Sequence, residues 1–170
     1  MSVNYPFRKI LVPTDFSSCS DSALELGANL ARDMGAALVA LHVIDLGHVP
    51  ADAVIRTDEH PEGITVRDHI VHLAERELAH RIERYGTDVS FRSSRVAFGP
   101  PVQAICDAAR ELGADLVVMG THGRGGLAHL VMGSVAEKVL RLAKLPVLTV
   151  REEVCVDHPL DPGLDGQDMG

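Results

Sequence analysis

The sequence predicts an α/β fold: a single doubly wound, five-stranded parallel sheet with helices on both faces, in a Rossmann-like arrangement. Short continuous apolar runs, typical of strands buried on both faces, alternate along the chain with amphipathic helical patterns. The 170 residues also suffice for one domain, which at this length buries about 70% of the surface of its unfolded chain.

The first strand is predicted at Lys9–Pro13, where KILVP is a short apolar run. A helical pattern follows and ends at Gly35, because glycine readily adopts the left-handed conformation that terminates helices. The apolar stripe of this helix consists of Ala23, Leu24, Leu30, Ala31 and Met34. The second buried strand is Ala36–Asp45, and the polar residues 46–64 after it are predicted to form a loop.

A long helix is predicted over residues 66–85, where an apolar face recurs at helical spacing. This face consists of Ile70, Ala74, Leu78, Ile82 and Tyr85. Glu77 and Arg81 are four residues apart and favour the helix as an ion pair. Val89–Phe98 then alternates between polar and apolar residues, so we expect a strand with one exposed face near an edge of the sheet.

Pro101 suits the first position of the next helix, which ends at Gly113. The stripe of this helix is Val102, Ile105, Ala109 and Leu112. A buried strand at Ala114–Gly120, a helix at Ser134–Ala143 and a strand at Leu145–Val150 complete the alternation. In such a fold, ligands bind beyond the carboxyl ends of the strands, where the strand order reverses.

Composition excludes several classes of protein. A net charge of −8 and an aromatic content of 4% argue against nucleic acid as a partner. No segment approaches the length of a membrane span, and the N-terminus lacks the pattern of a signal peptide. The three cysteines are widely spaced and form no CxxC pair, which is typical of reduced thiols. We therefore expect a cytoplasmic protein with neither nucleic-acid nor membrane partners.

The predicted domain covers residues 1–151, and an acidic tail covers residues 152–170. Between Arg151 and Gly170 there are six acidic residues and one basic residue. Because this segment is also rich in Asp, Gly and Pro, we expect it to be disordered.

The stretch from Gly120 to Ser134, GTHGRGGLAHLVMGS, crowds glycines between a strand and a helix. Long connections in compact domains are usually functional, and a helix start attracts phosphate through its N–H groups and its dipole. Gly133 lets a phosphate approach closely, Arg124 adds a planar cation, and Ser134 with Glu137 forms a predicted capping box. The sequence therefore predicts a phosphate site at this connection.

Two common phosphate motifs are absent from the sequence. GxxxxGK[ST] is not present, and GxGxxG fails because Ala128 occupies its last position. The glycines instead follow G-x2-G-x9-G-S, through Gly120, Gly123, Gly133 and Ser134. This loop resembles that of the ATP-binding universal stress proteins. ILVPTDFS, LHVID, ADLVVMGTHGRGG and GSVAEKVLRLAKLPVLTV resemble the same family in order and spacing, over roughly residues 7–151.

This resemblance implies an adenine nucleotide alpha hydrolase-like fold and a site for ATP, with Mg²⁺ or Mn²⁺ only as a companion of the phosphates. It implies that Asp15 binds the ribose hydroxyls, that Val43 binds the adenine edge through its backbone, and that Pro13 and Thr14 form the floor. Asp15 also follows from the residues themselves, because it ends a predicted strand. Val43 rests on the resemblance alone.

For the phosphates, the resemblance implies binding mainly by backbone N–H groups. The implied residues are Gly120, Gly123, Gly133, Ser134 and Val135, and the wall beside them consists of Met119, Thr121 and His122. Protonation of His122 beside phosphate could make affinity differ between pH 6 and pH 8.

Structural alternatives accompany these assignments. Asp15 could cap the first helix, although Ser17 or Ser18 can do the same, and the glycines could form an empty loop. His42 lies within a buried strand and is interpreted as a hydrogen-bonded core residue. Three histidines lie on one predicted helix: His69, His72 and His80. They could bind a metal ion, but no cluster of cysteines or carboxylates completes such a site, so a solvent-exposed helix face is favoured.

Three functions are compatible with the sequence. The first is a cytoplasmic universal stress protein that binds ATP and acts as a nucleotide-dependent signalling module. The second is a slow ATPase or nucleotidyl transferase, which is disfavoured because Asp15 is the one acid placed at the site and is assigned to ribose. The third is an ATP-independent scaffold. The resemblance implies a homodimer through Leu145–Val150, which suits both a binding module and a scaffold.

Overall fold

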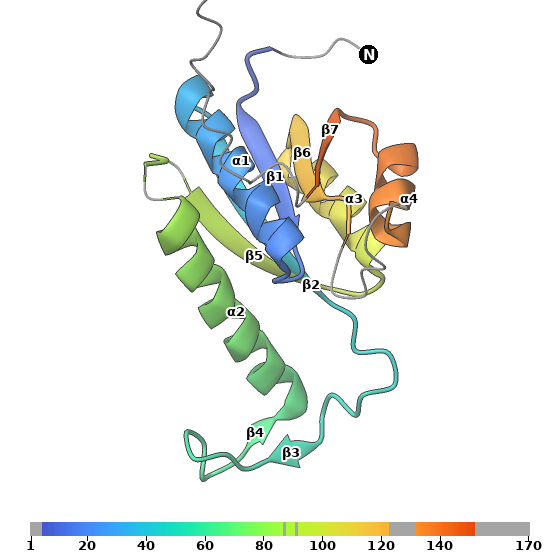
Figure 1. Ribbon diagram of the computed structural model, residues 1–170. Helices are drawn as coiled ribbons and strands as arrows, with labels where there is room; N and C mark the ends of the chain where they lie inside the picture. The colour runs from blue at the N-terminus through green and yellow to red at the C-terminus, as the bar shows by residue number, and fades with distance from the viewer. Residues whose placement is uncertain (1–4, 87, 91, 123–131, 152–170) are drawn as a thin grey trace, which may run out of the picture.

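The computed structural model describes residues 5–86, 88–90, 92–122 and 132–151. Five parallel strands form one sheet in the order β5-β2-β1-β6-β7, with β1 at its centre (Figure 1). These strands are β1 (Lys9–Thr14), β2 (Ala37–Ile44), β5 (Arg92–Phe98), β6 (Leu116–Gly120) and β7 (Val147–Val150). The predicted five-stranded parallel sheet is confirmed, and so is the position of β5 at an edge.

Two helices pack on each face of this sheet, as predicted. The helices α1 (Ser18–Met34) and α2 (Val66–Tyr85) cover one face, and α3 (Pro101–Leu112) and α4 (Ser134–Leu142) cover the other (Figure 1). Both α1 and α3 end at a glycine with a positive φ of 63°, at Gly35 and Gly113, as the sequence predicts.

The hydrophobic core has two halves because successive residues of a strand point to opposite faces of a sheet. On β1, Ile10 and Val12 pack with α1 and α2, whereas Leu11 between them packs with α3 and α4. All three side chains are fully buried. A continuous apolar run, in place of an alternating one, is what a strand covered on both faces requires.

Four strands are shorter than predicted, and β2 loses only one residue at each end, Ala36 and Asp45. β5 begins at Arg92, because Val89 belongs to a turn in which its N–H donates to the carbonyl of Gly86 at 3.1 Å. Val89 is nevertheless buried in the core, so its apolar character reflects packing outside the strand. β6 and β7 likewise begin two residues later than the apolar runs that predict them, at Leu116 and Val147.

Residues 46–64 were expected to form a loop, but the chain here contains a small antiparallel sheet. It pairs β3 (Val54–Ile55) with β4 (Ile64–Thr65) and projects beyond the main sheet at the start of α2 (Figure 1). Thr65 then caps α2 by accepting a hydrogen bond from the N–H of Asp68 at 3.0 Å. Two-residue strands are too short to show periodicity, which is why the pattern missed them.

None of the helices in the described ranges has both the length and the apolar character needed to cross a membrane.

Candidate functional site

The central strands β1 and β6 separate before they end. They pair through Ile10 with Leu116 and through Leu11 with Val117, and residues 12–14 of β1 and 118–120 of β6 have no β1–β6 pair. This is also where the strand order reverses, because the chain passes from β1 outward to β2 and β5 and returns to β6 on the other side. A parallel sheet offers its ligand crevice at such a point.

The turn after β1 is held by its own side chains. The buried Thr14 hydroxyl accepts the N–H of Phe16 at 3.0 Å and lies 2.9 Å from the hydroxyl of Ser20. Ser17 is the N-cap of α1 and accepts from the N–H of Ser20 at 3.3 Å. A carboxylate placed in this turn therefore has a defined position.

That carboxylate is Asp15, which is half-buried at the end of β1. Its Oδ1 accepts the Ser17 N–H at 3.2 Å and the Ser17 hydroxyl at 2.6 Å. Ser17 caps α1, so the interpretation of Asp15 as the helix cap is wrong. Asp15 instead lies at the carboxyl edge of the sheet, directly after β1, and a carboxylate can accept several hydrogen bonds through its two oxygens.

Phe16 is a feature of the site that the sequence analysis missed. Its φ of 66° lies in the left-handed region, which is uncommon for a bulky residue. Its ring stacks on His42 with 4.2 Å between centroids, and the guanidinium of Arg81 lies 4.7 Å above it. The sequence does place an aromatic residue between the polar residues Asp15 and Ser17, which could have drawn attention to Phe16. Its role was missed because the residues that contact it lie far away in the sequence.

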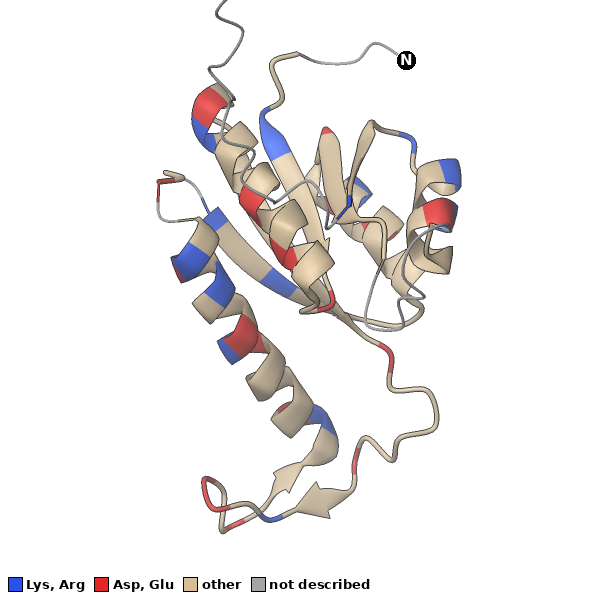
Figure 2. Ribbon diagram, viewed as in Figure 1, with Lys and Arg blue, Asp and Glu red and all other residues tan. Residues whose placement is uncertain are grey.

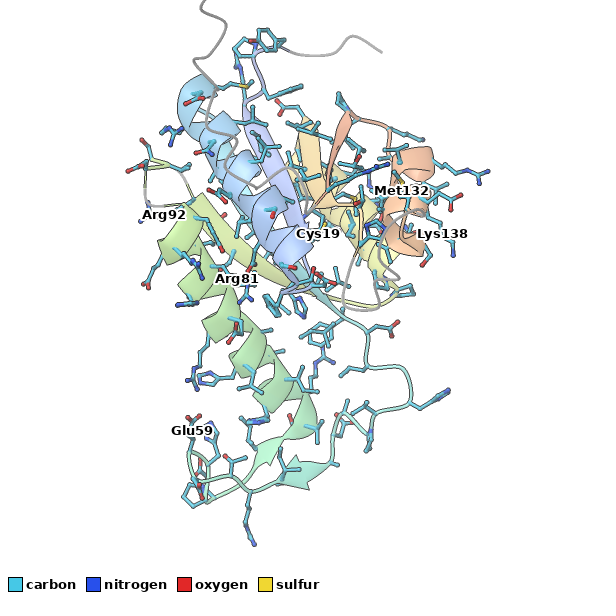
Figure 3. The ribbon with its side chains drawn as sticks, viewed as in Figure 1. Cys19, Glu59, Arg81, Arg92, Met132 and Lys138 are labelled. Carbon is cyan, nitrogen blue, oxygen red and sulfur yellow. The ribbon has the colours of Figure 1, made fainter. Side chains whose placement is uncertain are left out.

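Arg81 connects α2 to this turn (Figure 3). Its Nε donates to Asp21 of α1 at 2.8 Å, its Nη2 donates to the carbonyl of Phe16 at 3.3 Å, and its Nη1 bonds Glu77. The predicted Glu77–Arg81 pair is confirmed. Burial lowers the pKa of Arg81, but the hydrogen bonds to Asp21 and Glu77 outweigh it, so the pKa lies above its ordinary value. The side chain is therefore a permanent cation.

The end of β2 lies beside the turn. His42 has its Nδ1 2.8 Å from the carbonyl of Thr14, so its interpretation as a hydrogen-bonded residue is confirmed, but it is half-buried and does not belong to the buried core. The pairing of β2 with β1 stops at His42, and Val43 is the first residue beyond it. Val43 still pairs with Ala97 of β5, which holds its backbone in an extended conformation at the carboxyl edge.

At the end of β6, Gly120 lies against the first turn of α1. A Cβ at this position would stand 2.8 Å from the sulfur of Cys19 and 3.0 Å from its carbonyl oxygen. Figure 3 labels Cys19 at this contact between α1 and the sheet. The glycine therefore allows close packing of a helix on a strand, whatever else it binds. Met119 is buried on the opposite face, towards α3 and α4.

Thr121 and His122 continue from β6. The N–H of Thr121 donates to the carbonyl of Val150 at 2.8 Å, and its hydroxyl lies 2.9 Å from Nδ1 of His122. The carbonyl of Thr121 accepts the N–H of Gly133 at 2.7 Å. This last bond brings the start of α4 to the end of β6, so both ends of the glycine-rich connection meet.

The predicted capping box at Ser134 is wrong by one residue. Gly133 is the N-cap, with an extended backbone and no side-chain cap, and its carbonyl accepts the N–H of Glu137 at 2.9 Å. Ser134 is the first helical residue and is exposed, and Val135 follows it half-buried. The bond to Thr121 holds Gly133 at the cap position, where a Cβ would stand 3.0 Å from the Thr121 oxygen.

The structure thus brings most of the predicted residues to one edge of the sheet. Pro13 and Thr14 end β1 and Asp15 follows them, and Val43 lies near the end of β2. Met119 and Gly120 end β6, with Thr121 and His122 directly after it, and Gly133 caps α4, which begins with Ser134 and Val135. Gly123 and Arg124 lie outside the described residues, as does the tail 152–170. In the described parts of the chain, no group of three or more His, Cys, Asp or Glu could hold a metal ion.

The fold and this edge together define a class: α/β proteins whose ligand site lies at the switch point of a doubly wound parallel sheet. The comparison with known proteins gives the family. The model of the universal stress protein family matches residues 6–151. The chain belongs to the universal stress protein family.

Named relatives share most of its length. Universal stress protein MJ0531 of Methanocaldococcus jannaschii is 31% identical over 152 residues, which is 86% of this chain and 83% of the relative. Universal stress protein YxiE of Bacillus subtilis is 30% identical over 157 residues, which is 85% of this chain and 99% of the relative.

Solved structures share the fold. The structure of MJ0577, a protein of Methanocaldococcus jannaschii, matches with a TM-score of 0.70 and 28% identity, over 85% of this chain and 95% of that one. A universal stress protein solved in complex with cAMP matches with a TM-score of 0.61 and 25% identity, over 86% of this chain and 98% of that one.

Proposed function

We propose that this chain is a cytoplasmic, nucleotide-dependent stress-response module that binds ATP across the carboxyl ends of β1, β2 and β6. The observation that carries the proposal is the early separation of β1 and β6 at the switch point of the sheet. Family membership supports it, and so does the similar structure solved with cAMP, a nucleotide that shares adenine, ribose and phosphate with ATP.

In this proposal the nucleoside binds on the β1 and β2 side. The carboxylate of Asp15 accepts hydrogen bonds from the ribose hydroxyls, and the backbone of Val43 binds the adenine edge. Pro13 and Thr14 form the floor. Pro13 suits this place, because it lacks an N–H and lies where β1 has no β6 partner.

The phosphates bind between β6 and α4. Backbone N–H groups of Ser134 and Val135 belong to the first turn of α4, where they have no acceptor within the helix and the dipole favours an anion. Gly120 and Gly133 belong to this phosphate site in the proposal, with Met119 and His122 beside them. At each glycine a Cβ would meet protein atoms, those of Cys19 and of the Thr121 carbonyl, so the missing side chain serves packing. Gly123 and Arg124 complete the set, and Mg²⁺ or Mn²⁺ would accompany the triphosphate.

The expected affinity is micromolar. About four charge-assisted hydrogen bonds to phosphate, at roughly 1.5 kcal/mol each, and a buried adenine must overcome several kcal/mol of association cost. A binder of this strength responds to cellular ATP and releases it.

Calorimetric titration with ATP, ADP, AMP, cAMP and GTP tests the proposal. We expect micromolar binding of ATP and binding of GTP at least tenfold weaker, because the edge of guanine differs from that of adenine. Equal binding of GTP would contradict the role of Val43. No binding of any adenine nucleotide at millimolar concentration would contradict the whole proposal.

A dimeric scaffold that works without ATP is the second candidate, because β7 is an edge strand with an apolar side chain exposed. Leu148 of β7 is 39% exposed, and Leu142 at the end of α4 is 62% exposed. An unpaired strand edge is a template for another chain. We therefore propose a homodimer through Leu145–Val150, which serves the ATP-binding module equally well.

Replacing Leu148 with lysine tests this dimer, because a lysine on an edge strand opposes pairing between chains. We expect the natural protein to sediment as a dimer at micromolar concentration, and Leu148→Lys to raise the dimer dissociation constant at least tenfold. ATP affinity should not change. Ser93→Lys, on the exposed opposite edge strand β5, is the matched control and should remain dimeric. A natural protein that sediments as a monomer would refute the dimer.

A further inference from the structure

The turn that carries Asp15 adopts a conformation that its own sequence disfavours. Asp15 bonds Ser17 across Phe16, so the backbone at Phe16 sets the position of the carboxylate. Phe16 has a φ of 66°, in the left-handed region that bulky side chains rarely occupy. Contacts from elsewhere in the fold must therefore hold this residue in place.

Four contacts hold Phe16, one from within the turn and three from elsewhere in the fold, and two of the four come from Arg81. The N–H of Phe16 donates to Thr14 within the turn at 3.0 Å. Arg81, which is 65 residues away in the sequence, donates from Nη2 to the carbonyl of Phe16 at 3.3 Å and places its guanidinium 4.7 Å from the centre of the ring. The same ring stacks on His42 at 4.2 Å. Arg81 thus contacts both the backbone and the side chain of Phe16.

Arg81 is itself held firmly. Its side chain is only 13% exposed, and its Nε donates to Asp21 in the first turn of α1 at 2.8 Å. Glu77, one turn earlier on α2, binds Nη1. Figure 2 shows acidic residues along α1, basic residues on β5, and residues of both charges on α2. A planar fork with several donors suits such a branched arrangement, whereas a single ammonium group does not.

We propose that Arg81 is a positioning residue of the nucleotide site: it holds Phe16 in the left-handed conformation and so places the Asp15 carboxylate for ribose. This inference rests on the proposed function. It makes the packing of α2 on α1 a determinant of ribose affinity, although α2 itself contributes no ligand residue. Because two carboxylates pair with the guanidinium, its role is geometric and is not attraction of phosphate.

The test compares ATP with 2′,3′-dideoxy-ATP, which lacks the hydroxyls that Asp15 would bind. In Arg81→Met we expect ATP affinity to fall about fivefold to tenfold, and the affinity for the dideoxy analogue to change less than twofold. Arg81→Lys should behave like Arg81→Met, because it keeps the charge but loses the fork. Arg84→Met is the matched control, since Arg84 lies over the ring of Tyr85 on the same helix. It should leave both affinities unchanged.

Each outcome decides the inference. If Arg81→Met weakened the binding of ATP and of the dideoxy analogue equally, Arg81 would have a general structural role and the inference would be overturned. An unchanged preference for ATP over the analogue would overturn it as well. If Arg81→Met does not fold by circular dichroism, Asp21→Asn is tested in its place, with about a threefold loss expected for ATP alone. If the natural protein binds both ligands equally, the ribose role of Asp15 fails and this inference with it. If it binds neither ligand, the proposed function fails as well.

Discussion

Asp15→Ala is expected to weaken ATP binding about 30-fold, because it removes a charged acceptor whose hydrogen bonds are each worth roughly 1.5–3 kcal/mol. The affinity for 2′,3′-dideoxy-ATP should change little, so that the variant no longer distinguishes the two nucleotides. Calorimetry with both ligands measures this loss of discrimination. The hydrogen bonds that the Asp15 carboxylate accepts from Ser17 make its position specific before any ligand binds.

Asp33→Ala is the matched control for Asp15→Ala. Asp33 lies near the end of α1, its side chain is 66% exposed, and it pairs with the adjacent Arg32. The Asp33→Ala substitution removes the same charge as Asp15→Ala but lies outside the proposed site, so ATP affinity should stay within twofold of that of the natural protein. Equal losses in the two variants would mean that net charge, and not the position of Asp15, governs binding.

Gly120→Ala is expected to cost about 2 kcal/mol of unfolding free energy, the range found for overpacked interiors. The added Cβ would stand 2.8 Å from the Cys19 sulfur and 3.0 Å from its carbonyl oxygen, so α1 must shift away from β6. For a chain of this length, the melting temperature should fall by about 4–8 °C. Chemical and thermal denaturation measure both quantities.

Two variants show whether the contact with Cys19 is the cause. Gly35→Ala meets nothing within 4 Å but has a φ of 63°, so it should cost only about 1 kcal/mol, from backbone strain. Cys19→Ala removes the sulfur but leaves the carbonyl, so the double variant Cys19→Ala/Gly120→Ala should be less destabilised than the sum of the two by about 0.5–1 kcal/mol. Strict additivity would contradict this explanation.

Local sequence signals predicted the elements of this protein well. The apolar runs and helical stripes gave the five parallel strands and four main helices, because burial on one face or two leaves a distinct periodicity. The predicted helix ends at Gly35 and Gly113 are also confirmed, because the left-handed glycine that ends a helix acts within one helical turn. The short strands β3 and β4 left no comparable signal.

For the site, the sequence predicted which strand ends matter but not how they are built. Asp15 and Gly120 could be chosen because parallel strands of one sheet end at the same edge. The sequence suggested a cap at Ser134, yet a bond from Gly133 to Thr121 moves the cap by one residue. Local patterns cannot anticipate that bond, because it joins two ends of a long connection.

By itself the sequence determined the five strands of the main sheet and the four helices, apart from some of their ends, because these elements depend on neighbours a few residues apart. Only the tertiary structure decided that β1 and β6 separate early, that α1 packs onto Gly120, and that Arg81 reaches Phe16. These features depend on contacts between residues far apart in the chain. Such contacts form only when the whole sheet and its helices are packed together.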